Sequence, residues 1–141
     1  PDRIIVGAGT CGTIAGLTAG VSISGYKIKI TGVRCAEPII CNRRKINSLA
    51  NRVLRFTGSK NKVDPKLFEI VESPRNNGYA KTTAGAHFII DDFQFLEGIR
   101  LDTTYTSKVI MFLSNALLEN HYENESLLYW HTFSPAAMEG V

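Results

Sequence analysis

The sequence lacks the long apolar run of a membrane-spanning helix, since no stretch approaches the roughly 18 residues that such a helix needs. It has only three cysteines, an odd number without the spacing of a metal site, which argues against a disulfide framework and a zinc site. The first residues also lack the charged and apolar regions of a signal peptide. We therefore expect no metal, no membrane segment and a reducing, cytoplasmic location.

The sequence also has little excess charge. Its formal net charge of +3 over 141 residues does not indicate nucleic acid as a partner. Seven cations fall between residues 43 and 62, but a nucleic-acid surface needs aromatic or grooved context as well. We interpret this stretch as the solvent-exposed face of a helix. An apolar content of 44% is ordinary for a globular protein, and the length fits one domain.

Strand and helix patterns alternate along the chain. Short β-branched or alternating runs predict strands at residues 4–6, 27–33, 67–71 and 127–130. Amphipathic or small-residue patterns predict helices at residues 13–21, 43–57, 87–98 and 105–119. The crossovers are long enough for parallel pairing, so we predict one α/β domain over residues 1–141, a three-layer parallel sheet flanked by helices.

The first predicted strand leads into the glycine-rich stretch Gly7-Ala8-Gly9-Thr10-Cys11-Gly12, which fits the dinucleotide fingerprint G-x-G-x-x-G. A strand, a glycine loop and a helix N-terminus together form an anion site. A nicotinamide dinucleotide requires an acidic residue about 20 positions further on, and none is present, although Arg34 suits a 2′-phosphate. The hydroxyls of Thr10 and Thr13 favour a simple phosphate. A dinucleotide, a monophosphate cofactor and a purely structural turn remain open from the loop alone.

Four stretches together resemble the fold-type II pyridoxal-phosphate enzymes. Residues 9–17 resemble the phosphate loop G-S-G-G-T-x-A-G-L, and residues 78–80 resemble the motif G-Y-G. Residues 97–108 are similar to E-G-I-x-L-D-P-V-Y-T-G-K, and residues 127–132 are similar to a closing strand that ends in H-T-G-G. The stretches follow the family's order across almost the whole chain. The specific resemblance is to D-cysteine desulfhydrase and 1-aminocyclopropane-1-carboxylate deaminase.

This resemblance implies a fold similar to the large domain of fold-type II enzymes, which is tryptophan synthase beta-like, and pyridoxal 5′-phosphate as the cofactor. It implies two active-site tyrosines that act on a small amino-acid substrate, Tyr79 and Tyr105. It also implies a set of cofactor-binding residues: Gly9, Thr10, Cys11, Gly12, Thr13, Thr106 and Thr132. Without the resemblance, the tyrosines read as half-buried surface residues, and Thr104 or Thr106 as a helix N-cap.

The resemblance also exposes departures from the family. The less conservative departures from its motifs are Cys11, Ala80, Thr103, Ser107, Phe133 and Ser134. Family members are more than twice as long, and their Schiff-base lysine lies in an N-terminal part without a match here. Lys108 matches a different family lysine. We therefore expect this chain, which starts at Pro1 close to the loop, to be the C-terminal, cofactor-cradling portion of a longer, homodimeric enzyme. Whether the chain alone is an enzyme stays open.

Thr106 bears on the reaction that the resemblance implies. The deaminase branch has a carboxylate at this position, which keeps the pyridine nitrogen protonated, and the desulfhydrase branch has threonine. A neutral hydroxyl leaves the ring a weaker electron sink, which suits elimination of a good sulfur leaving group. We therefore expect a D-cysteine desulfhydrase, which forms pyruvate, hydrogen sulfide and ammonia. The alternatives are 1-aminocyclopropane-1-carboxylate deaminase, a Rossmann-type nicotinamide-binding protein and a non-catalytic anion-binding domain.

Overall fold

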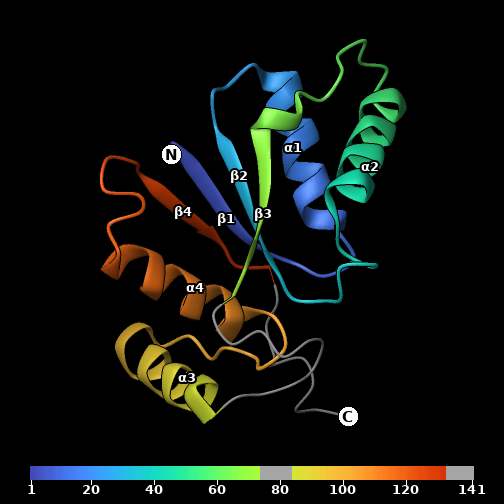
Figure 1. The fold of residues 1–141 in the computed structure, drawn as a ribbon. Coiled ribbons are helices and arrows are strands. Elements are labelled where there is room, and N and C mark those ends of the chain that lie inside the picture. The colour runs from blue at the N-terminus through green and yellow to red at the C-terminus, as the bar shows by residue number, and fades with distance from the viewer. Residues whose placement is uncertain (74–83, 133–141) are drawn as a thin grey trace.

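The computed structural model describes residues 1–73 and 84–132. Its elements follow the predicted order, and their ends lie within three residues of the predicted ends (Figure 1). They are β1 (Arg3–Ala8), α1 (Gly12–Ser24), β2 (Lys29–Arg34), α2 (Arg43–Phe56), the 3-10 helix η1 (Pro65–Leu67), β3 (Phe68–Glu72), α3 (Ala84–Glu97), α4 (Thr106–Leu118) and β4 (Leu127–Trp130). None of the helices in these residues is long and apolar enough to cross a membrane.

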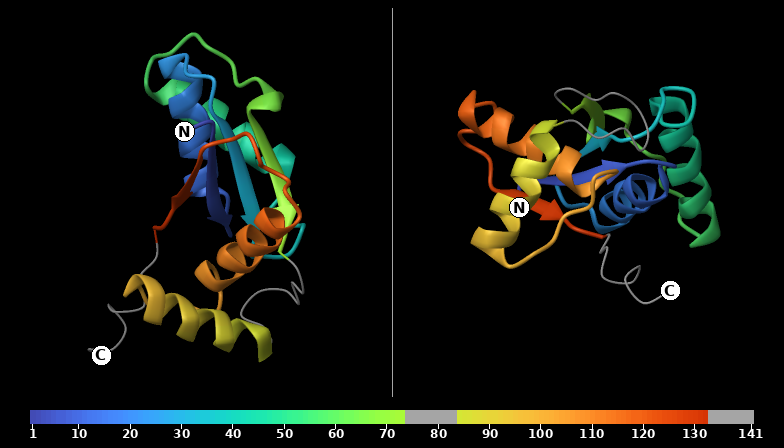
Figure 2. Two further views of the ribbon diagram at one scale, coloured as in Figure 1. Left: turned by 90° about the vertical axis from the view of Figure 1, so that its left-hand side faces the viewer. Right: turned by 90° about the horizontal axis from the view of Figure 1, so that it is seen from below.

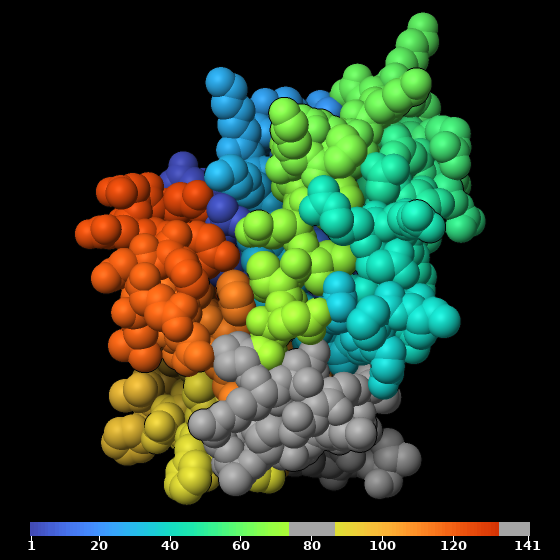
Figure 3. All heavy atoms as spheres, viewed as in Figure 1, coloured from blue at the N-terminus to red at the C-terminus, as the bar shows by residue number. Residues whose placement is uncertain are grey.

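The four strands form one parallel sheet in the order β3-β2-β1-β4. Helices α1 and α2 cover one face, and α4 covers the other with α3 packed outside it (Figure 2). The predicted three-layer α/β fold is therefore confirmed. Figure 3 shows the outer side of the edge strand β3 between α2 and α4.

Alternation along the strands divides the core between the two faces. Ile4 and Val6 of β1 pack with the α1 and α2 side chains, whereas Ile5 packs with Val109 of α4. Gly32 of β2 has no side chain at the point where Ile14 of α1 packs onto the sheet, and a Cβ there would overlap the Ile14 side chain. This absence lets α1 lie close to the sheet directly after the glycine loop.

The chain reverses its direction across the sheet at β1. The connection through α1 leads to β2 on one side of β1, whereas β4 pairs with β1 on its other side. In open α/β sheets, the crevice at the carboxyl ends of the strands on either side of such a point is where ligands bind. The fold alone therefore directs attention to the space beyond Ala8 and Trp130.

Candidate functional site

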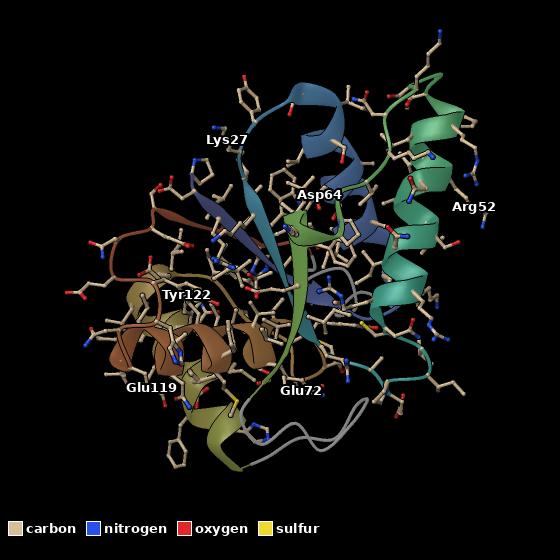
Figure 4. The ribbon with its side chains drawn as sticks, turned by 45° about the horizontal axis from the view of Figure 1, so that its top comes forward. Lys27, Arg52, Asp64, Glu72, Glu119 and Tyr122 are labelled. Atoms are coloured by element: carbon tan, nitrogen blue, oxygen red, sulfur yellow. The ribbon has the colours of Figure 1, made fainter. Side chains whose placement is uncertain are left out.

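A cavity of about 310 Å³ opens at this switch point. Three segments line it: the glycine loop with the first turn of α1, the start of α4, and the end of β4. Its volume is at the lower end of the range for small-molecule sites. Glu72, the last residue of β3, lies at this carboxyl end of the sheet, whereas Lys27 and Asp64 lie at the opposite end (Figure 4).

Eight of the nine residues singled out from the sequence line this one cavity. They are Gly9, Thr10, Cys11, Gly12, Thr13, Tyr105, Thr106 and Thr132. The ninth, Tyr79, lies outside the described residues. Residues that are more than 90 positions apart in the sequence thus meet around one space.

The loop leaves the N-terminus of α1 open to an anion. Cys11 is the N-cap residue and makes no side-chain hydrogen bond to the helix, and the first turn carries no acidic residue. The hydroxyl-bearing Thr10 and Thr13 are both exposed and both line the cavity. Unpaired N–H groups, the helix dipole and two hydroxyls suit a phosphate group. The donor set therefore fits the phosphate end of pyridoxal phosphate.

Cys11 adopts a left-handed backbone conformation, with φ of 73°. Glycine adopts this region without steric cost, which accounts for the glycine that the related motif has at this position. The Cys11 side chain is buried, and its Sγ lies 3.8 Å from the carbonyl oxygen of Ile40. Packing thus holds the loop in a shape that glycine would adopt by itself.

The Thr106 hydroxyl forms its hydrogen bonds with Asp102 and does not cap the helix. The Thr106 hydroxyl donates to Oδ2 of Asp102 at 2.6 Å, and the backbone N–H of Asp102 donates to the same hydroxyl at 2.6 Å. Asp102 Oδ1 also accepts from the backbone N–H groups of Thr104 and Tyr105, each at 2.7 Å. The expected N-cap at Thr104 or Thr106 is wrong, because Tyr105 is the N-cap residue and the Asp102 carboxylate does the capping.

Two aromatic residues at the end of β4 line the cavity and were missed in the sequence. They are Tyr129 and Trp130, whose side chains point to opposite faces of the sheet. Burial raises the pKa of the Tyr129 hydroxyl, and the nearby Asp102 carboxylate raises it further. Their position at the end of the predicted strand 127–130 was the available signal, since residues at a strand's carboxyl end line such a crevice.

Arg34, the alternative partner for a dinucleotide 2′-phosphate, makes an ion pair with Glu72 of the neighbouring strand at 2.6 Å. The two residues are register partners at the carboxyl ends of β2 and β3. Neither lines the cavity. Among the described residues that line the cavity there is therefore no carboxylate for a dinucleotide ribose, and Arg34 is paired with a carboxylate outside it.

No group of His, Cys, Asp and Glu within residues 1–73 and 84–132 is placed to hold a metal ion. The three cysteines are buried as free thiols. Burial raises the pKa of Cys35 to about 11 and that of Cys41 to about 12. The Cys35 and Cys41 thiols are therefore protonated at neutral pH, unlike activated nucleophiles.

The fold and the cavity define a parallel α/β domain with a phosphate-type site at its switch point, and comparison with known proteins shows what the chain is similar to. No protein-family model matches the chain. The chain is 29% identical over 136 residues to a proposed 1-aminocyclopropane-1-carboxylate deaminase of Thermotoga maritima and 30% identical over 131 residues to one of Pyrococcus horikoshii. Each alignment covers 93% of the chain. The chain is also 25% identical over 138 residues to a D-cysteine desulfhydrase of Klebsiella pneumoniae.

A solved structure agrees with these sequence relatives. The crystal structure of an ACC deaminase homologue superposes with a TM-score of 0.79 at 30% identity and covers 93% of the chain. Over 93% or more of its length the chain is therefore similar to proteins named as 1-aminocyclopropane-1-carboxylate deaminases and D-cysteine desulfhydrases, the two kinds of enzyme whose motifs its sequence resembles. It spans about 40% of the length of the relatives that it matches.

Proposed function

We propose that this chain is the cofactor-cradling part of a pyridoxal-phosphate-dependent lyase or deaminase that acts on a small amino acid. One observation carries the proposal: three distant segments, each selected by a sequence motif, line a single cavity at the switch point of the sheet. The homology with deaminases and desulfhydrases over 93% or more of the chain supports it.

The residues divide the work of binding as follows. The N–H groups of the loop from Gly9 to Thr13 and its two threonine hydroxyls hold the cofactor phosphate. The hydroxyls of Thr106 and Thr132 bind the ring nitrogen of the cofactor. The hydroxyls of Tyr105 and Tyr79 hold the substrate carboxylate or move a proton. Pyridoxal phosphate, when bound, supplies an electron-withdrawing ring that eases loss of a group from the substrate.

The Schiff-base lysine belongs, by the resemblance, to a further part of the enzyme, and two surfaces support the existence of that part. Helix α1 contains no charged residue, although its residues Gly12, Gly16, Gly20 and Ile23 are exposed. Leu128 and Trp130 of the edge strand β4 are also exposed, at 39% and 41%. Helices without a polar face are normally buried. Additional polypeptide would cover these surfaces, and we propose a homodimer for the complete enzyme.

For the reaction we propose elimination from D-cysteine, with deamination of 1-aminocyclopropane-1-carboxylate as the second candidate. Thr106 favours the first, because it stands where the deaminase motif has a carboxylate. The relatives carry both names, so the comparisons support both substrates equally. The three buried free thiols support a reducing, cytoplasmic location.

Fluorescence of Trp130 tests cofactor binding directly, because it is the only tryptophan of the chain and it lines the cavity. We expect saturable quenching with pyridoxal phosphate and with pyridoxine 5′-phosphate, and none with NAD or NADP. Thr13→Val should weaken the binding of both phosphate compounds, whereas Thr57→Val, at the end of α2, should leave their binding unchanged. Tight binding of NADP, without binding of pyridoxal phosphate or pyridoxine 5′-phosphate, would reverse the assignment of the cofactor.

The substrate is tested on the full-length enzyme from which the chain comes. D-cysteine and 1-aminocyclopropane-1-carboxylate are supplied in parallel, and sulfide, pyruvate and 2-oxobutyrate are measured. Sulfide and pyruvate from D-cysteine, without 2-oxobutyrate from the second compound, are the expected products. Efficient release of 2-oxobutyrate would assign the enzyme to the deaminase branch.

A further inference from the structure

The Thr106 hydroxyl has one proton, and the structure shows where it goes. An ionised carboxylate only accepts hydrogen bonds, so the 2.6 Å contact with Asp102 Oδ2 requires Thr106 to be the donor. The Asp102 backbone N–H, which only donates, occupies one of the two hydroxyl lone pairs at 2.6 Å. A single lone pair then remains for any other partner.

Thr106 is 3% exposed, so bulk water does not compete freely for its hydroxyl. The residue nevertheless lines the cavity. Toward the cavity, therefore, the hydroxyl can accept a hydrogen bond but has no proton left to donate. A partner that lacks a proton of its own would meet a lone pair and be repelled.

We propose that Asp102 is a positioning residue that makes Thr106 an acceptor toward the cavity, so that the site selects a cofactor ring nitrogen in its protonated, cationic form. This inference rests on the proposed function, because it concerns the ring nitrogen of pyridoxal phosphate. The hydroxyl then relays the negative charge of Asp102 to the pyridinium. A charge-assisted chain of this kind is stronger than a bond between neutral groups.

The inference changes the meaning of threonine at position 106. A lone hydroxyl favours a neutral ring, but a hydroxyl backed by a carboxylate favours the pyridinium, as a carboxylate itself would. The deaminase branch then has its carboxylate next to the ring nitrogen, whereas this chain has its carboxylate, Asp102, one hydroxyl further away. In both cases a negative charge favours the protonated ring. Thr106 would permit a stronger electron sink than its residue type suggests, so the choice between D-cysteine and 1-aminocyclopropane-1-carboxylate would then rest on the substrate assay and not on a weak electron sink.

The titratable groups near Asp102 lie on β4, directly after β2, and on α4. Its carboxylate acts on Tyr129 of β4 and on Cys35, which follows β2, and Lys108 of α4 also acts on Cys35. Burial keeps both the phenol and the thiol neutral through the physiological range by raising their pKa values. Asp102 and Lys108 are therefore the charged groups among these four, and only Asp102 bonds to the Thr106 hydroxyl.

The test uses ¹⁵N-labelled pyridoxine 5′-phosphate, which lacks the aldehyde and so cannot react with lysines. Quenching of Trp130 reports its binding, and the ¹⁵N chemical shift followed against pH gives the pKa of the bound ring nitrogen. In the parent chain we expect that pKa to lie above that of the free compound. Asp102→Asn places an amide donor beside Thr106, turns the hydroxyl proton toward the cavity, and should lower the pKa of the bound ring by about one unit or more.

Three variants separate this role from a structural one. Thr106→Val removes the hydroxyl but leaves the bonds of Asp102 to Thr104 and Tyr105, and it should lower the pKa as Asp102→Asn does. Thr106→Ser should retain the parent value. Glu119→Gln, at the far end of α4, removes one negative charge and should have no effect. Thr106→Val keeps the test decisive if Asp102→Asn fails to fold.

Each outcome is distinct. Binding with an unchanged ring pKa in Asp102→Asn and in Thr106→Val would overturn the inference and leave the proposed function intact. Absence of Trp130 quenching by pyridoxine 5′-phosphate in the parent chain would overturn both.

Discussion

The ring of Tyr105 lies directly against the backbone of Gly9. A Cβ placed on Gly9 would be 2.8 Å from Cε1 of Tyr105 and 3.4 Å from its hydroxyl oxygen. The tyrosine is the N-cap residue of α4, and its backbone N–H is held by Asp102. The phosphate loop on one face of the sheet and the start of α4 on the other are therefore packed together at this contact.

Gly9→Ala should displace the Tyr105 ring, because a contact below about 3 Å cannot be accommodated in place. We expect a loss of about 1–3 kcal/mol in the free energy of unfolding, as for other overpacked positions. Weaker quenching of Trp130 by pyridoxine 5′-phosphate should accompany it. Urea unfolding and the fluorescence titration measure the two effects.

Gly16→Ala is the matched control, since a Cβ there meets nothing within 4 Å. Alanine in place of an exposed helical glycine should raise the stability of this chain by about 0.5–1 kcal/mol. Equal stability of Gly9→Ala and the parent would show that Tyr105 does not rest on the loop.

Ser107 carries a buried hydroxyl without a hydrogen-bond partner among the described residues, at a position where the related motif has glycine. A buried polar group without a partner costs about 1–3 kcal/mol. Ser107→Ala should therefore stabilise the chain by about 1 kcal/mol, seen as a higher urea midpoint with an unchanged slope.

Ser73→Ala is the counterpart of that substitution. Ser73 is equally buried, but its hydroxyl donates to the carbonyl oxygen of Lys108 at 2.8 Å. Its removal should destabilise the chain by about 1 kcal/mol. If both substitutions destabilise, Ser107 has a partner in solution.

The strands and the glycine loop were predictable because their signals are local. Alternation in residues 27–33 and the glycines of residues 7–12 depend only on neighbours in the sequence. Parallel pairing then brings the carboxyl ends together, so the order of motifs was enough to predict one site. The position of Tyr105 on Gly9 was not predictable, since it depends on how α4 approaches the sheet.

The role of Asp102 could not be predicted either. Its carboxylate accepts from three different residues, and this arrangement depends on the loop geometry before α4 rather than on residue type. From the sequence, a cap at Thr104 or Thr106 was the alternative to a cofactor role for Thr106, because threonine has capping propensity. The ion pair between Arg34 and Glu72 was equally hidden, because it requires the register of β2 against β3.

Alkaline pH should destabilise the chain through its buried thiols. Burial raises the pKa of Cys35 from its ordinary 9.0 to about 11 and that of Cys41 to about 12. In the unfolded chain the thiols ionise at about pH 8.5–9, whereas in the folded chain they stay protonated. Their contribution is therefore complete below that pH and is lost as the pH rises through the folded values.

Urea unfolding between pH 8 and pH 11 measures this loss. We expect the free energy of unfolding to fall steadily above about pH 9, with a smaller pH dependence in Cys35→Ala. Iodoacetamide at pH 8 should label the folded chain slowly and the urea-unfolded chain at all three cysteines. Rapid labelling of Cys35 in the folded chain would contradict its burial.

Substitutions at the other end of β1 should change the stability of the chain without changing binding at the cavity. Arg3 is 5% exposed, and its guanidinium bonds to Thr31 at 2.6 Å, to Glu69, and to Glu125 Oε1 at 3.1 Å. It also lies 4.5 Å from the ring centre of Tyr122, which Figure 4 labels. One cation thus joins β1, β2, β3 and the segment before β4.

Arg3→Met should cost about 2–3 kcal/mol of unfolding free energy, because it leaves the two carboxylates and the threonine without their shared donor. The cost is below that of a fully buried pair, since Glu69 and Glu125 reach water, with side chains 45% and 26% exposed. Arg3→Lys keeps the charge but loses the planar fork, so an intermediate loss is expected.

Neither Arg3 substitution should alter quenching of Trp130 by pyridoxine 5′-phosphate at temperatures where the chain remains folded. Arg3 and Ala8 lie at opposite ends of β1, about 16 Å apart at the usual rise per residue. The cavity lies at the Ala8 end, and Arg3 does not line it. A binding constant that fell in proportion to stability, in Arg3→Met and Arg3→Lys alike, would show that the site and the ion network open together and are not independent parts of the fold.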